Sequence, residues 1–170
     1  PLYSSAASDV YKRQLLIQNN HLHICDTFEL PGMFEGFYDN GVILIDKNLS
    51  DAKKLEVLSE ELAHHEITYG NILNEQDVQN KRYELKARRL ANEKIVSLKG
   101  IIEAFLQGIH NLYELANFFE VTESFVLQSI EHYKQKYGYS TRYGKYVIQF
   151  DPLRAVSYTH LRAHETRGNL

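Results

Sequence analysis

The segment SEELAHHEITYG, residues 59–70, gathers carboxylates and imidazoles in a stretch whose periodicity is helical. Residues four apart on an α-helix lie about 40° apart around its axis, so Glu60 and His64 share one face. That face points away from the stripe of leucines contributed by the preceding turns. The spacing therefore predicts two potential metal ligands, one turn apart, on the polar side of an amphipathic helix.

Glu61 lies on the same turn as Glu60, between the polar and apolar faces of this helix. Two ligands one turn apart can grip a metal ion while an adjacent carboxylate, held off the metal, takes a proton from water. The usual pattern is His-Glu-x-x-His, and here it reads Glu60-Glu61-Leu62-Ala63-His64. The alternative interpretation is a solvated acidic helix face with two incidental histidines.

A third candidate ligand, Glu84, lies in a second predicted helix. The residues that follow Glu84 on one narrow face of that helix are Ala87, Ala91 and Ile95. Small residues let another helix approach closely, and a carboxylate buried at the head of such a face needs a positive partner. That partner is either Arg88, as an ordinary ion pair four residues on, or a metal ion shared with Glu60 and His64.

A second register, with Glu61 and His65 as the ligand pair, is also compatible with the spacing. Both positions turn toward the apolar stripe, which favours a packing role for His65 or a role in supporting the ligands. We assign Arg88 to a similar supporting position beside Glu84.

The elements around these helices can be predicted from local patterns. Residues 21–46 are aromatic and β-branched and are broken by Asp39-Asn40-Gly41, which predicts a small antiparallel sheet. Ser50 can cap the first helix, which should run to about His65 or one turn beyond. The second helix should run from about residue 75 to 94.

The second half of the chain predicts three shorter helices and a hairpin. The helical patterns are IIEAFLQ, NLYELANFF and FVLQSIEHYKQKY, and the last of them has a Thr122-x-x-Phe125 start. The alternating segment TRYGKYVIQFDP should form the hairpin. Without repeats or low-complexity linkers, sheet, helices and hairpin most simply form one α+β domain over residues 15–154.

Composition narrows the class of protein. The 170 residues carry a formal charge of −3 and a single cysteine, Cys25. Residues 1–14 and 155–170 resemble translated sequencing-adapter sequence and are set aside, which leaves 15 basic and 20 acidic residues, a charge of −5. This balance gives no general attraction to nucleic acid. One cysteine and the lack of an apolar run of about 18 residues favour a cytoplasmic, non-membrane protein.

The segments EELAHH of the first predicted helix and ELKARRLA of the second together resemble the ImmA/IrrE metallopeptidases of phages and mobile elements. The resemblance is to the branch of that family with glutamate at the first motif position. FEGFYDNGVILIDKNL and ELANFFEVTESFVLQSI are similar to that family too. The resemblance implies a zincin-like helix pair with Glu60, His64 and Glu84 as metal ligands and Glu61 as general base. It also implies Zn²⁺ as cofactor and a helix-turn-helix repressor as protein substrate.

The glutamate at position 60 leaves two functional alternatives open. Replacing an imidazole by an anion lowers the positive charge of a zinc site, so activity would be weaker or the metal would be Mn²⁺. The second alternative is an inactive relative that only binds a partner protein.

A third hypothesis is DNA binding, because residues 111–133 have the pattern of a helix-turn-helix: a helix, a short turn and a second helix. The prospective recognition helix carries acidic residues, with lysines only at its end, which is poor chemistry for phosphate contacts. We expect this C-terminal helix-turn-helix-like subdomain to serve packing or substrate docking, without direct binding of nucleic acid.

Overall fold

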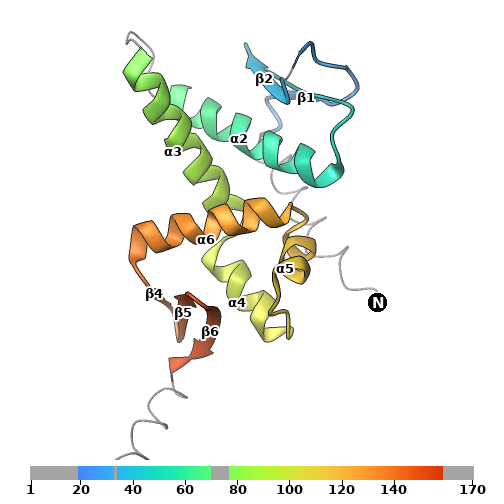
Figure 1. Cartoon of the computed structure of the whole chain (residues 1–170). Helices are drawn as coiled ribbons and strands as arrows, with labels where there is room; N and C mark the ends of the chain where they lie inside the picture. Colours follow the sequence, from blue (N-terminus) through green and yellow to red (C-terminus); the bar gives the residue numbers. More distant parts are fainter. Residues whose placement is uncertain (1–18, 33, 70–76, 159–170) are drawn as a thin grey trace, which may run out of the picture.

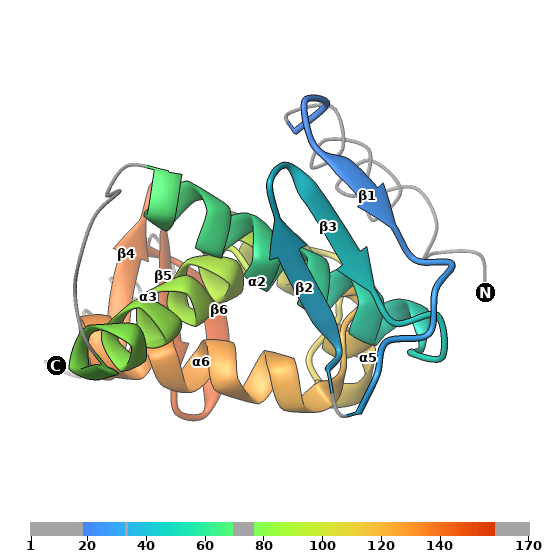
Figure 2. The same ribbon diagram turned by 90° about the horizontal axis from the view of Figure 1, so that it is seen from above.

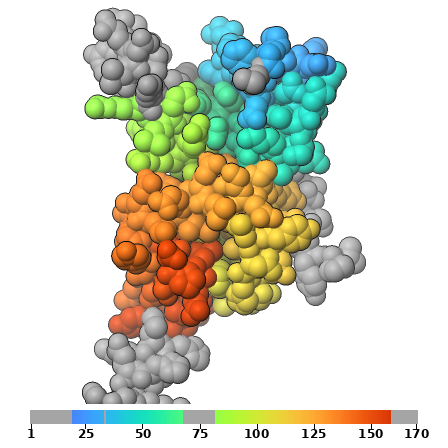
Figure 3. Space-filling model, viewed as in Figure 1, coloured from blue at the N-terminus to red at the C-terminus, as the bar shows by residue number. Residues whose placement is uncertain are grey.

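The computed structural model describes residues 19–32, 34–69 and 77–158 (Figure 1). The elements in chain order are β1 (His23–Cys25), β2 (Gly36–Asp39), β3 (Val42–Ile45), α2 (Asp51–Tyr69), α3 (Asp77–Ile95), α4 (Leu98–Leu106), α5 (Leu112–Phe119), α6 (Glu123–Tyr137), β4 (Ser140–Tyr143), β5 (Tyr146–Phe150) and β6 (Leu153–Ser157). Helix α6 crosses the middle of the molecule, between the first sheet with α2 and α3 and the region of α4, α5 and the second sheet (Figures 1 and 3). The predicted α+β class is confirmed.

The first sheet has the strand order β1-β3-β2 and is mixed. Strands β2 and β3 form the predicted hairpin, whose turn residues Asn40 and Gly41 have φ angles of 45° and 87°. Both values are left-handed, as a tight two-residue hairpin turn requires. Strand β1, however, pairs in parallel with β3, so the prediction of a purely antiparallel sheet is wrong. The reason is topological: β3 inserts between β1 and β2, and alternation of side chains does not encode that order.

Helix α2 begins as predicted and lies against this sheet (Figure 2). The Ser50 hydroxyl accepts a hydrogen bond from the Lys53 amide at 3.3 Å. The leucine stripe of α2 is buried in one core with two residues of β3, and its members are Leu55, Leu58, Leu62, Ile43 and Ile45. The helix extends one turn past His65, to Tyr69.

Helices α2 and α3 meet through small side chains. Ala63 of α2 and the predicted stripe residues Ala87 and Ala91 of α3 are fully buried in one cluster with Ile67. Alanine at these positions lets the two backbones approach closely. The expected start of the second helix at residue 75 lies outside the described residues.

Helix α6 begins at its predicted cap residue and follows a sharp turn at the end of α5. The Thr122 hydroxyl accepts a hydrogen bond from the Phe125 amide at 3.2 Å and so caps α6. Helix α5 ends at Glu120, whose φ of 54° is left-handed and turns the chain sharply toward α6. The expected helix-turn-helix-like arrangement is thus present in α5 and α6.

The predicted terminal hairpin is part of a three-stranded antiparallel sheet, in the order β4-β5-β6. Strand β6 pairs with β5 from Phe150↔Leu153 to Tyr146↔Ser157. The extra strand runs three residues past Arg154, the end of the segment used for the sequence-based prediction, and for that reason only a hairpin was expected. None of the described helices combines the length and the apolar character that crossing a membrane requires.

Candidate metal centre

Helix α2 lies between strand β2 and helix α3. It carries two rows of candidate ligands, Glu60 with His64 and Glu61 with His65, and the two rows face different neighbours. On the β2 side, a Cβ atom added to Gly36 would lie 3.3 Å from Glu61 Oε1, and the rings of Tyr38 and His65 have centroids 5.0 Å apart. Glu61 and His65 therefore form the row beneath β2. This row is half-buried by the strand.

The other row, Glu60 and His64, faces α3. His64 Nε2 lies 3.5 Å from Glu84 Oε2, and Glu60 Oε1 lies 3.7 Å from Arg88 Nε. Two side chains one turn apart on α2 thus meet two side chains one turn apart on α3. Of the two registers, Glu60 with His64 is thus the pair that faces α3, and Glu61 with His65 is the pair that faces β2.

Arg88 is placed differently from the ion pair considered from the sequence. It lies against Glu60 of the neighbouring helix, while Glu84 lies against His64. The side chain of Glu84 is also 60% exposed, so the expectation that it is buried is wrong. Glu84 lies one turn outside the alanine contact that buries Ala87, and there the two helices no longer cover it.

Burial shifts the pKa of the two adjacent glutamates, Glu60 and Glu61. It raises the pKa of Glu60, against the opposing effect of the Arg88 guanidinium, and it raises the pKa of Glu61. The charge of His64 lowers the pKa of Glu61, and the carboxylates of Glu60 and Glu84 raise it further. The three predicted metal ligands therefore all lie within electrostatic reach of Glu61, the expected base.

The role of β2 as a wall of this centre was not recognised in the sequence. Gly36 approaches α2 so closely that an added Cβ would lie 2.3 Å from Val57 Cγ1. A glycine inside a strand often marks such a close approach, so FEGFY did carry the signal. His65, expected to pack or to support the ligands, lies against Tyr38 and His21, with ring centroids 5.0 and 5.7 Å away.

Comparison with known protein families gives a match over residues 13–131, to the family described as IrrE N-terminal-like domain (Peptidase_M78). The chain belongs to this family. The matched span includes the first sheet, both helices of the candidate centre and most of α6. Comparison with curated proteins finds no match.

Membership of the IrrE N-terminal-like family confirms the resemblance inferred from EELAHH and ELKARRLA. It supports a metallopeptidase-type function for the chain and, in general terms, a metal requirement. It specifies neither the ion nor the substrate.

The residues of the centre fit a cation by chemical type and, in part, by position. Within residues 19–32, 34–69 and 77–158, no three His, Cys, Asp or Glu side chains are grouped closely enough to hold a metal ion. His64 and Glu84 already face each other, while Glu60 lies against Arg88. Burial disfavours the charged forms of Glu60 and Glu61. A cation bound where α2 meets α3 would stabilise these charged forms and so offset the free-energy cost of their burial.

Proposed function

We propose that this chain is a metal-dependent endopeptidase that cleaves a protein substrate, with Glu60, His64 and Glu84 as metal ligands and Glu61 as general base. The observation that carries the proposal is the contact between His64 and Glu84 across α2 and α3, with Glu60 one turn before His64 and the half-buried Glu61 beside it. An incidental acidic helix face would not need an imidazole facing a carboxylate of the next helix.

In this proposal Glu61 moves the proton. Its carboxylate accepts a proton from the attacking water and delivers it to the amide nitrogen of the leaving peptide segment. A raised pKa suits this role, because a base works best when its pKa approaches the working pH. When bound, a zinc ion would supply the Lewis acidity that polarises the peptide carbonyl. With two carboxylates and one imidazole as ligands, Mn²⁺ is the alternative ion.

The proposed substrate is a helix-turn-helix repressor of a phage or mobile element, and the proposed compartment is the cytoplasm. The substrate follows from the resemblance to ImmA/IrrE metallopeptidases, and the compartment follows from the single cysteine, Cys25. Cleavage of such a repressor would derepress the element that encodes it.

A second candidate function is metal-independent binding of a partner protein. The contact between Arg88 and Glu60 favours it, because the guanidinium supplies a positive charge to one proposed ligand without any metal. In that case the surface formed by α2 and α3 would hold the partner without hydrolysing it.

Metal content decides between these candidates. Elemental analysis of the purified protein should give about one zinc or manganese per chain, because the site holds a single ion. His64→Ala and Glu84→Ala should each lose it, whereas His23→Ala and Glu103→Ala, which change exposed residues elsewhere, should retain it. Full metal content in both ligand variants would overturn the ligand assignment.

Cleavage of the purified repressor encoded beside this chain tests the reaction itself. The wild-type protein should give two defined fragments, and a chelator should abolish them. Binding of the repressor without any fragments, by a protein that contains metal, would favour the second candidate.

A further inference from the structure

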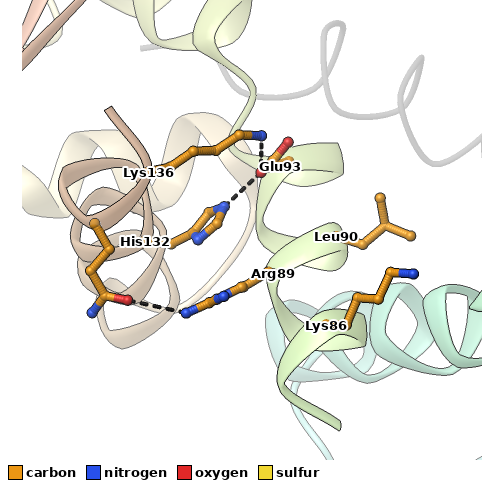
Figure 4. Close-up of a pocket in the computed structure, with 7 residues that line it drawn as sticks. Lys86, Arg89, Leu90, Glu93, His132 and Lys136 are labelled. Atoms are coloured by element: carbon orange, nitrogen blue, oxygen red, sulfur yellow. Dashed lines mark hydrogen bonds and ion pairs between the residues drawn. The ribbon is translucent and has the colours of Figure 1, made fainter. Parts of the chain in front are cut away.

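A groove of about 400 Å³ lies between α3 and α6, on a different contact from the candidate metal centre (Figure 4). Its lining residues come from those two helices only, and they are Lys86, Arg89, Leu90, Glu93, His132, Gln135 and Lys136. The volume is in the range that binds small molecules. Neither the family match nor the proposed peptidase reaction gives this groove a role.

The groove is strongly basic in a chain that is acidic overall. Lys86, Arg89 and Lys136 line the groove together with one carboxylate, Glu93, so two positive charges are in excess, while the whole chain has a formal charge of −3. Positively charged side chains that lie close together repel one another, and a bound anion would offset that repulsion.

Glu93 already binds two other groups through one of its oxygen atoms. Its Oε1 atom lies 2.6 Å from His132 Nε2 and 2.7 Å from Lys136 Nζ (Figure 4). Burial would raise the pKa of Glu93, but the hydrogen bonds from Lys136 and His132 outweigh it and hold the pKa below its usual range. Glu93 therefore stays ionised and holds Lys136 at the groove.

Lys86 and Arg89 have no such partner. Within the described part of the chain, no carboxylate forms an ion pair with either side chain, and Arg89 has only a long contact of 3.4 Å from Nη2 to the amide oxygen of Gln135. Arg89 extends toward the side of α6 that carries His132, whereas Lys86 extends away from α6 (Figure 4). These cations are thus available to a ligand.

The second ring nitrogen of His132 provides an independent indication. His132 is 9% exposed, and its Nδ1 atom has no hydrogen-bond partner among the described residues. A buried polar atom without a partner costs free energy, and such atoms are uncommon unless a ligand or water completes them.

We propose that the α3–α6 groove binds a small phosphate-bearing molecule, with Arg89 and Lys86 of α3 and Lys136 of α6 as its charged contacts. The arginine fork matches two phosphate oxygens at once, and the two lysines add point charges from opposite walls. A bound phosphate group would therefore tie α3 to α6. Because α3 also carries Glu84, the ligand would stabilise the helix that completes the candidate metal centre.

Pyrophosphate is the probe for this site, measured by isothermal titration calorimetry and by the thermal unfolding midpoint at fixed ionic strength. It should bind and raise the midpoint as expected for a ligand that binds only the folded state, and citrate should bind more weakly. Arg89→Gln and Lys86→Gln should each weaken binding by about tenfold or more, because each removes a charge-assisted contact. Arg142→Gln, which changes an exposed residue of β4, is the matched control.

Several results would overturn the proposal. One is an affinity for pyrophosphate that is the same in Lys86→Gln, Arg89→Gln and wild type. The others are binding of pyrophosphate that is no stronger than that of chloride, and binding of citrate that is as strong as that of pyrophosphate. Binding of duplex DNA that depends on Arg89, without binding of pyrophosphate, would assign the groove to nucleic acid instead. Lys86 is exposed and has no ion-pair partner in the described structure, so its variant tests the site even where Arg89→Gln affects folding.

Discussion

Two adjacent glutamates of α2 illustrate how position on one turn determines the chemistry of a side chain. Glu60 faces α3 and the Arg88 guanidinium, whereas Glu61 faces β2, where Gly36 leaves just enough room for it. Burial raises the pKa of both, but within the described residues only Glu60 has an arginine against it. The residue best placed to accept and return a proton is therefore Glu61, and the one best placed to meet a cation from α3 is Glu60.

Glu61→Gln should separate metal binding from catalysis. The amide keeps the shape of the side chain but cannot take a proton from water, so cleavage of the repressor should fall by about 10²- to 10⁴-fold. Metal content and far-UV circular dichroism should remain those of wild type. A variant that cleaves at the wild-type rate would show that another group acts as base.

Asp46 should make stability depend on pH. Its buried carboxylate accepts hydrogen bonds from the amides of Leu30 at 2.8 Å and Asn48 at 2.7 Å, and these bonds lower its pKa. A lowered folded-state pKa stabilises the protein above the unfolded value of about 3.9, and this contribution is lost as the pH falls through the folded-state value.

Asp46→Asn should therefore lower the free energy of unfolding most at neutral pH, with a difference from wild type that shrinks below about pH 4. Urea denaturation at several pH values measures this difference. Asp39→Asn, a change of an exposed carboxylate on β2, should show little effect at any pH. A difference for Asp46→Asn that is constant with pH would contradict the assignment of the stabilisation to the ionised carboxylate.

Among the elements, helix α2 has the central position because different neighbours cover three of its faces. The leucine stripe packs in the core with β3, the Glu61–His65 row lies beneath β2, and the Glu60–His64 row meets α3. The small side chains of Ala63, Ala87 and Ala91 set the close separation of α2 and α3. The distance between His64 and Glu84 depends on that separation.

Ala91→Leu should disturb the centre without changing any residue of it. Ala91 is fully buried, so the larger side chain must push α2 and α3 apart, at a cost of about 1–3 kcal/mol in unfolding free energy. Metal content and cleavage should fall together with stability. Arg82→Leu, at an exposed position of the same helix, should leave all three unchanged.

At the scale of the whole molecule, α6 connects the second sheet with the junction of α3 and α4 through one buried tyrosine. The Tyr133 hydroxyl donates a hydrogen bond of 2.8 Å to the carbonyl of Val96, at the junction of α3 and α4. The Tyr133 ring also stacks on Phe150 of β5, with centroids 5.6 Å apart. Near the other end of α6, Glu56 of α2 accepts a hydrogen bond of 2.7 Å from the amide of Thr122. The first and second halves of the chain are thus joined at both ends of α6.

Tyr133→Phe should test this connection. The ring and its stacking remain, while the Val96 carbonyl loses a buried donor, so the free energy of unfolding should fall by about 1–2 kcal/mol. Tyr137→Phe, which changes a side chain that is 40% exposed, is the matched control. Urea denaturation followed by circular dichroism measures both variants, and equal stabilities would show that the hydroxyl contributes nothing.

Local patterns in the sequence were sufficient for the elements and the motif residues. The helical period placed the leucine stripe and the Glu60–His64 row on different faces of α2, and Ser50 and Thr122 marked helix starts because their hydroxyls cap nearby amides. The same reasoning predicted the Ala87–Ala91 contact, since only small residues allow two helices to approach so closely. These features depend on neighbours within one or two helical turns.

Tertiary structure alone decided how groups from distant segments meet. It paired Arg88 with Glu60 rather than with Glu84, set β1 parallel to β3, and brought Lys136 and His132 of α6 onto Glu93 of α3. Each of these contacts joins residues from separate elements, and no local period encodes which of several compatible partners lies nearest once the core has formed. The sequence by itself thus determined which side chains are available for chemistry, while packing of the helices determined which of them act together.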